Sequence, residues 1–258
     1  MRAIYRPAGK ALEYASLACN LYQGCTHGCL YCWAPKVLRM NAEEFHASGK
    51  PRPGILEALR RDAHRYAGSA DPVLLCFTSD PYQPDEDKHE TTREAIGILR
   101  EHDIPVHVLT KGGMRASRDF PLLEGPGCAF GTTLCWADDL DRLHWEPGAA
   151  SVADRIRAIK LAHYLGIRTW ASVEPVIVPE QAIALIGELS EWVDEFRVGK
   201  LNYHPTARDI DWAGWAPRIL AALEASGREY LVKESLRSYL PAEAQACGTE
   251  RMAANGSI

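Results

Sequence analysis

The chain has 258 residues, enough to bury a large hydrophobic core, and we expect residues 1–258 to form a single domain. Hydrophobic residues make up 47% and charged residues 24% of the sequence, a composition that excludes a disordered chain. The net charge of −5 gives no support to a protein that grips duplex nucleic acid mainly through its phosphates.

The opening segment, residues 1–18, carries no apolar core of a secretion signal, and no run approaches the roughly 18 apolar residues of a membrane span. We therefore expect a cytoplasmic protein with reduced cysteines and no membrane partner. The segment leads into an apolar run from Tyr14 to Cys19, which predicts a first strand.

The densest group of potential metal ligands follows this strand: Cys25, Cys29 and Cys32, at spacings of four and three residues. Gly24 and Gly28 let the backbone turn tightly around a metal centre. Thiolates are the ligands of many zinc sites and of iron–sulfur clusters. We therefore predict a metal-binding loop, the cluster loop, over residues 24–33.

Three interpretations of the cluster loop compete. A closed zinc site needs a fourth ligand, which His27 would have to supply. A redox dithiol built on Cys29 and Cys32 would leave Cys25 without a role. Three thiolates on a four-iron cluster leave one iron open to an outside ligand, and this reactive site is the interpretation that we favour. The other cysteines are scattered singly along the chain: Cys19, Cys76, Cys128, Cys135 and Cys247.

Helical and strand patterns alternate after the polar stretch that ends at Pro53, which we expect to be a loop with about one helical turn. Apolar residues at helical spacing predict helices over residues 55–67, 90–101, 152–165, 180–193 and 216–225. Short apolar runs predict strands over residues 72–78, 105–110, 128–134, 169–173, 196–199 and 229–233.

Repeated strand–helix units imply a parallel sheet with helices outside it. Six units and a final strand predict an α/β fold of the partial (β/α)6, TIM-type barrel class, with a doubly wound sheet as the alternative. In both folds, reactive groups gather at the carboxyl ends of the strands. The polar residues that follow the predicted strands are therefore site candidates: Ser79, Asp80, Lys111, Cys135, Glu174, Asn202 and Tyr203.

Several of these candidates have a second interpretation. Asp80 precedes Pro81 and is also suited to capping a turn. Glu174 and Lys200 end otherwise apolar runs, where an unpaired charge is costly, so they pair with each other or with polar groups of a ligand. Lys111 precedes two glycines that allow a ligand to approach the backbone closely.

The pattern CxxxCxxC, with Tyr31 before the third cysteine, resembles the signature of the radical S-adenosylmethionine (SAM) enzymes. The strings NLYQGCTHGC (residues 20–29) and TSDPYQP (residues 78–84) resemble a narrower branch, the proteins related to spore photoproduct lyase. This resemblance implies the partial barrel, a [4Fe-4S] cluster on Cys25, Cys29 and Cys32, SAM chelated by the open iron, and a low-potential electron donor of the flavodoxin or ferredoxin type.

On this basis, Lys111 is expected to pair with the SAM carboxylate. Apart from the resemblance, Cys135 and Tyr203, which follow predicted strands, are candidate hydrogen donors. The full set of predicted cofactor contacts is Tyr31, Ser79, Asp80, Lys111, Glu174 and Asn202.

The chain departs from the spore photoproduct lyase pattern at two positions of the radical relay. Tyr31 matches one relay tyrosine, but Trp33 stands in place of the second and Phe77 in place of the cysteine that returns hydrogen. Cys76 is displaced by one residue, which on a strand turns its side chain to the opposite face. We therefore predict that this protein does not repair spore photoproduct by the relay of that enzyme.

The sequence thus predicts an enzyme that reductively cleaves SAM to a 5′-deoxyadenosyl radical, which takes a hydrogen atom from an unidentified substrate. Nucleic acid is suggested by the branch alone, and a peptide, nucleoside or small metabolite is equally compatible. The alternative is a metal-stabilised nucleic-acid-binding or protein-binding module without catalysis. An electron-transfer protein is disfavoured because such proteins usually supply four ligands per cluster.

Overall fold

The computed structural model describes residues 1–245, so that Cys247 lies outside the described residues. Eight strands form one sheet in the order β1-β2-β5-β6-β7-β8-β9-β10. Every neighbouring pair from β2 onward is parallel, and only β1 runs antiparallel, against β2. The strands are β1 (Ile4–Tyr5), β2 (Leu17–Cys19), β5 (Val73–Leu75), β6 (Val106–Thr110), β7 (Ala129–Thr133), β8 (Arg168–Val176), β9 (Glu195–Lys200) and β10 (Glu229–Val232).

This strand order decides between the two predicted folds. Parallel strands that follow one another in chain order, each reached through a crossover, build the wall of a barrel, whereas a doubly wound sheet reverses its order at a switch point. Since β1 and β10 are the two edges of the sheet, the barrel is open. The predicted partial barrel is confirmed.

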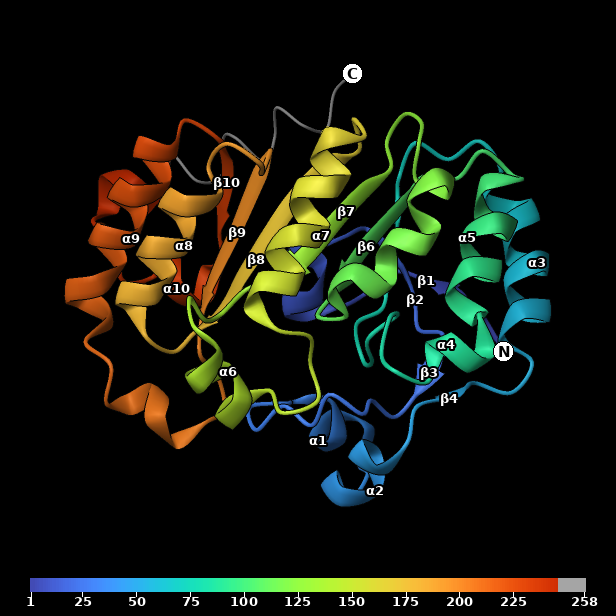
Figure 1. The fold of residues 1–258 in the computed structure, drawn as a ribbon, viewed down its shortest axis with the longest axis horizontal. Helices are drawn as coiled ribbons and strands as arrows, with labels where there is room; N and C mark the ends of the chain where they lie inside the picture. Colours follow the sequence, from blue (N-terminus) through green and yellow to red (C-terminus); the bar gives the residue numbers. More distant parts are fainter. Residues whose placement is uncertain (246–258) are drawn as a thin grey trace.

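Helices cover the outer face of the sheet, with α7 in front of it in Figure 1. The crossovers run through α3 (Ile55–Tyr66), α5 (Thr91–Arg100), the 3-10 helix η2 (Gly113–Leu122), α7 (Val152–Tyr164), α8 (Pro179–Leu189) and α9 (Trp212–Ser226). The apolar stripe of α3 shows how the main core forms: Ile55, Ala58, Leu59 and Ala63 recur at helical spacing and are buried against the sheet.

The concave face of the sheet holds a second, smaller core, which includes Ala18, Leu74 and Trp170. A Cβ atom at Gly131 would lie 2.2 Å from the Trp170 ring, so a glycine there makes room for the indole. The Arg197 guanidinium lies 4.3 Å from the centre of that ring. These side chains fill the floor of the barrel, as expected for a packed interior.

Short elements surround the carboxyl ends of the strands. They are the hairpin β3 (Tyr22–Gln23) and β4 (Lys50–Pro51), the helices α1 (Ala34–Leu38), α2 (Ala42–Ala47), α4 (Glu86–His89), α6 (Asp139–Trp145) and α10 (Glu234–Arg237), and the 3-10 helix η3 (Pro205–Arg208). In Figure 1, the cluster loop, α1, α2 and α6 lie together along the lower edge of the molecule.

Two local expectations were wrong. The stretch after the cluster loop, expected to be mostly loop, contains both α1 and α2, and Asn41 caps α2 by accepting a hydrogen bond from the amide of Glu44 at 3.2 Å. The strand expected to begin at Tyr14 begins at Leu17, because the 3-10 helix η1 (Gly9–Glu13) comes before it and Tyr14 caps the end of that helix. No helix among the described residues has the length and apolar character needed to cross a membrane.

Candidate active site

The cluster loop leaves β3 through Gly24, whose φ of +83° favours glycine. A Cβ atom there would lie only 2.1 Å from the carbonyl oxygen of Ser48, so no other residue fits. The next amide, that of Cys25, donates to the carbonyl of Phe45 at 3.0 Å. The ring Nδ1 of His46 lies 2.8 Å from the Cys25 carbonyl oxygen. The segment around α2 therefore holds the first cysteine in place.

The remaining anchors of the loop come from two distant segments. Gln83, within the TSDPYQP string, accepts from the amide of Thr26 at 3.0 Å and donates to the carbonyl of Gly24 at 3.4 Å. The amide of Leu30 donates to the carbonyl of Trp145 at the end of α6 at 2.9 Å. Three regions that are separate in the sequence thus fix the backbone that presents the cysteines.

The three cysteines of the loop are free thiols, with Cys25 buried and Cys29 and Cys32 partly exposed. Burial raises the pKa of each thiol, that of Cys29 to about 12. Within residues 1–245, no three His, Cys, Asp or Glu side chains are gathered closely enough to hold a single metal ion. Three free thiols on one loop are a donor set that either predicted centre, a zinc ion or an iron–sulfur cluster, would use.

Asp80 links the cluster loop to the sheet. Its carboxylate accepts hydrogen bonds from the Thr110 hydroxyl at 2.5 Å, the Lys111 amide at 2.7 Å and the Tyr82 amide at 2.8 Å. The ring Nδ1 of His27, inside the loop, lies 3.5 Å from the same carboxylate. Both oxygens of Asp80 thus bind protein groups in this structure, and its contact with SAM stays a prediction.

His27 and Ser79 each keep a polar atom without a protein partner among the described residues. The His27 side chain is buried, and burial lowers its pKa to about 4, so the ring is neutral near pH 7. Its Nε2 atom makes no hydrogen bond, and neither does the buried hydroxyl oxygen of Ser79. Buried polar atoms usually have partners, so these two fit a site that receives a polar group from a ligand.

A buried polar cluster lies behind the loop. The Tyr31 hydroxyl donates to Glu146 and lies 3.8 Å from the Cys135 sulfur. Glu146 pairs with Arg155 at 2.5 Å, and both side chains are almost wholly buried. The Lys111 ammonium lies 5.7 Å from the centre of the Tyr31 ring. The structure therefore brings together three of the predicted residues, Tyr31, Lys111 and Cys135.

The charges in this cluster support one another. Burial alone would raise the pKa of Glu146, but the positive charges of Arg155 and Lys111 outweigh it, so the pKa is lowered and the carboxylate stays ionised. Burial alone would lower the pKa of Lys111, but the charges that Cys29 and Glu146 carry when ionised raise it. A lysine whose pKa is raised in this way is suited to an anionic group of a bound ligand.

Glu174 lies near the carboxyl end of β8. It accepts hydrogen bonds from the Tyr14 hydroxyl and from the Lys233 ammonium, the latter at 3.0 Å. A Cβ atom at Gly199 would lie 2.6 Å from its carboxylate, so glycine leaves room for it. The pairing of Glu174 with Lys200, one of the two predicted alternatives, is wrong, because Lys200 donates to Tyr239 at 3.0 Å instead.

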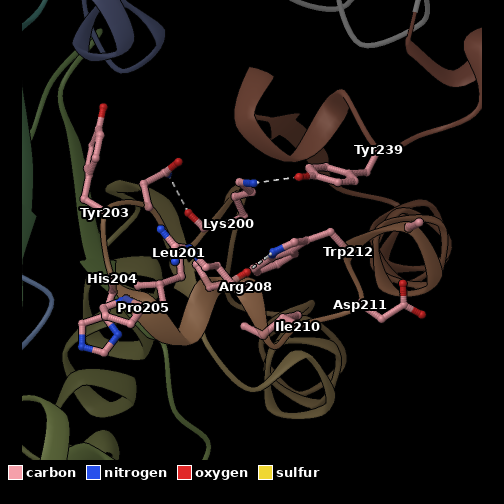
Figure 2. A pocket seen from close by; sticks show the side chains of 13 residues that line it. Lys200, Leu201, Tyr203, His204, Pro205, Arg208, Ile210, Asp211, Trp212 and Tyr239 are labelled. Atoms are coloured by element: carbon pink, nitrogen blue, oxygen red, sulfur yellow. Dashed lines mark hydrogen bonds between the residues drawn. The ribbon is translucent and has the colours of Figure 1, made fainter.

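Asn202 and Tyr203 follow β9 and border a pocket of about 790 Å³, shown in Figure 2. Asn202 accepts from the Lys10 ammonium at 3.2 Å and donates to the carbonyl of Lys200 at 2.8 Å. Tyr203 is 75% exposed, and the ammonium groups of Lys10 and Lys36 lie 5.4 and 5.7 Å from its ring centre. Tyr203 is thus open to solvent, whereas Cys135, the other predicted hydrogen donor, is buried.

Four residues of this region were missed by sequence reasoning: Tyr14, Glu146, Arg155 and Lys233. Two of them could have been identified from the sequence. Arg155 lies on the apolar stripe of its helix with Val152 and Ile159, where a charge needs a buried partner. Lys233 ends the last predicted strand, where the rule for carboxyl ends of strands applies.

A sequence model of the radical SAM superfamily matches residues 19–193. The chain belongs to the radical SAM superfamily. Uncharacterized proteins of Mycobacterium tuberculosis and Mycobacterium bovis are 32% identical to this superfamily member over 166 residues, which cover 61% of its chain and 48% of theirs. The chain therefore spans about half the length of the curated relatives it matches.

Solved structures of other radical SAM enzymes share the fold. A spore photoproduct lyase variant with bound SAM and dinucleoside spore photoproduct is 16% identical, with a TM-score of 0.65 over 85% of this chain and 76% of that one. SuiB of Streptococcus suis bound to SAM is 14% identical, with a TM-score of 0.62 over 85% of this chain and 51% of that one. At this level of identity, the likeness establishes the partial barrel alone.

Proposed function

We propose that the chain is a SAM-dependent radical enzyme in which Cys25, Cys29 and Cys32 hold a [4Fe-4S] cluster. The observation that carries the proposal is the set of three free thiols on a loop anchored from three sides, with a charged lysine close by. When bound, the cluster would chelate SAM at its open iron, and one-electron reduction would cleave SAM to methionine and a 5′-deoxyadenosyl radical. The protein then has to hold SAM and the substrate and to exclude water.

Different residues around the cluster loop bind SAM and the substrate. Lys111 pairs with the SAM carboxylate, and Asp80 keeps Lys111 in place through its backbone amide. The unpaired hydroxyl of Ser79 and the ring of Tyr31 are further SAM contacts. Glu174, near the carboxyl end of β8, and Asn202, just after β9, contact SAM or substrate.

Hydrogen donation is proposed for Cys135 and Tyr203. Burial raises the pKa of the Cys135 thiol, so it keeps the S–H bond that a hydrogen-atom donor must have. Its sulfur lies 3.8 Å from the Tyr31 hydroxyl, whose O–H bond is a second source of a hydrogen atom beside the thiol. Tyr203 is placed for a substrate that enters through the pocket after β9, because its ring is exposed beside that pocket.

We propose that this pocket receives the substrate. Exposed Tyr203 with two lysine ammonium groups near its ring, together with Tyr239 in the lining, offers the aromatic and cationic groups that single-stranded nucleic acid requires. A peptide is the second candidate, since SuiB, which has the same fold, has been solved bound to the precursor peptide SuiA. We further propose a single cytoplasmic domain over residues 1–258, reduced by a flavodoxin or ferredoxin.

The test is anaerobic reconstitution with iron and sulfide, followed by an assay for reductant-dependent formation of 5′-deoxyadenosine from SAM. We expect product from the wild type and none from Cys29→Ala. Cys128→Ala is the matched control, because Cys128 is buried at the start of β7 and its sulfur accepts from the amide of Val106 at 3.3 Å. Bound zinc without SAM cleavage would instead support the alternative, a metal-stabilised binding module without catalysis.

A further inference from the structure

Exposed apolar side chains gather on the cluster loop and on α1. Leu30 is 53%, Trp33 40%, Val37 63% and Leu38 40% exposed, and we call these four residues the apolar patch. Only Ala34 and Pro35 of α1 are buried, so the helix presents most of its surface to solvent. Large apolar side chains clustered on one exposed segment are typical of an interaction surface.

Positive charge borders the apolar patch. Lys36 and Arg39 lie within the same segment, and neither pairs with a carboxylate among residues 1–245. The net charge of the chain is −5, yet residues 33–52 contain four cations, Lys36, Arg39, Lys50 and Arg52, against two acids, Glu43 and Glu44. The patch therefore lies in a locally positive region of an acidic protein, which favours an acidic partner.

The aspartates of α6, next to the cluster loop, already have hydrogen-bond or ion-pair partners. In α6, Asp138 caps the helix by accepting from the amide of Leu140 at 2.9 Å, and Asp139 pairs with Arg142 at 2.8 Å. Asp141 accepts from Gln181 at 2.6 Å. These carboxylates are therefore held by partners of their own, while Lys36 and Arg39 remain available to a partner protein.

The location of the patch connects it with the cysteines. Leu30 follows Cys29 directly, and Trp33 follows Cys32 directly. Figure 1 shows this segment at the outer edge of the molecule, away from the layer formed by α3, α5, α7, α8 and α9. A protein seated on the patch would thus touch residues adjacent to two of the three proposed cluster ligands.

We propose that the apolar patch, with Lys36 and Arg39, docks an acidic one-electron carrier protein of the flavodoxin or ferredoxin class. The inference rests on the proposed function and names the surface through which its electron arrives. One electron leaves the carrier's reduced flavin or iron–sulfur centre and is taken up at the site held by Cys25, Cys29 and Cys32. No bond forms or breaks at the patch. A small apolar contact within a charged rim suits such a transient encounter.

The test compares two reductants on the reconstituted protein. Arg39→Glu reverses a charge beside the patch and leaves Lys36, whose ammonium lies beside the Tyr203 ring of the proposed substrate pocket, unchanged. Arg61→Glu is the matched control on α3, in the outer helical layer. SAM cleavage is driven either by dithionite, which needs no docking surface, or by reduced flavodoxin. The affinity of oxidised flavodoxin for each protein is measured separately by calorimetry at two salt concentrations. Val37→Asn, at an exposed position, is a second variant that leaves the charges intact.

We expect the patch reversal to lower flavodoxin-driven cleavage and flavodoxin affinity about tenfold at low salt, with dithionite-driven cleavage unchanged. The control should change either quantity less than about twofold. Unchanged flavodoxin-driven cleavage and binding would overturn the inference, as would an equal loss with both reductants. Lost binding of single-stranded oligonucleotide with flavodoxin binding intact would also overturn it and assign the patch to substrate. If dithionite drives no cleavage in any protein, the proposed function fails, and the calorimetry alone decides the docking surface.

Discussion

The buried pair of Glu146 and Arg155 supports Tyr31, and breaking it should be costly. In Arg155→Met, the chain loses the 2.5 Å ion pair and the hydrogen bonds from Arg155 to the carbonyls of Ala150 at 2.9 Å and Thr133 at 3.0 Å. The Glu146 carboxylate, which is fully buried, then keeps only the Tyr31 hydroxyl and the more distant Lys111 charge. Removing one partner of a buried ion pair typically destabilises a protein by about 3–5 kcal/mol.

Urea unfolding of the metal-free protein at pH 7 measures this loss. Arg157→Met is the matched control, because Arg157 lies on the same helix, is 69% exposed and pairs with Asp154 at 2.7 Å. Such a surface pair is worth less than about 1 kcal/mol. In Glu146→Leu/Arg155→Met no buried charge remains, so this double variant should be more stable than Arg155→Met alone. If Arg155→Met and Arg157→Met unfold at the same urea concentration, the reasoning is refuted.

Three further outcomes follow from the site and the barrel. Gly24→Ala should lose more stability and more bound iron than Gly68→Ala, because both positions have positive φ but only Gly24 has a backbone oxygen 2.1 Å from the added Cβ. Asp80→Asn leaves at least one of its three donors unpaired and should cost about 1–3 kcal/mol in urea unfolding, and equal stability would contradict the role given to that carboxylate. Burial and then the Arg197 charge lower the pKa of His107 from 6.5 to about 4. The unfolded chain binds this proton more readily than the folded chain. The free energy of unfolding should therefore fall as the pH drops below 6.5, by at most about 1.4 kcal/mol per pH unit. His107→Gln should remove this contribution to the pH dependence of stability.

The sheet was predictable because most positions of its strands are buried. All of β7 and alternate residues of β6 are buried, and the helices of the outer layer present apolar residues to the sheet. The short helices outside the main α/β pattern were less predictable. The 3-10 helix η2 contains Pro121, a residue that interrupts a regular helix, and no helix was predicted there. The helices α1 and α2 have five and six residues, too few to establish a period.

The three cysteines were predictable because they are close together in the sequence, whereas the contacts of the site depend on long-range packing. Tyr14 lies 160 residues from Glu174, and Tyr31 lies 115 residues from Glu146. No local pattern relates such pairs. The rule for carboxyl ends of strands nevertheless identified Glu174, because it depends on the topology and not on the partner. Tyr31 was identified by the resemblance to the radical SAM signature.

The central claim is that three cysteines hold a cluster with one open iron at which SAM binds. Electron paramagnetic resonance of the reconstituted, reduced protein tests it most directly, with spectra recorded before and after addition of SAM. The account predicts about four irons and four sulfides per chain, a reduced-cluster signal, and a change in that signal when SAM is added. A signal that SAM leaves unchanged, or iron binding that survives in Cys29→Ala, would contradict it.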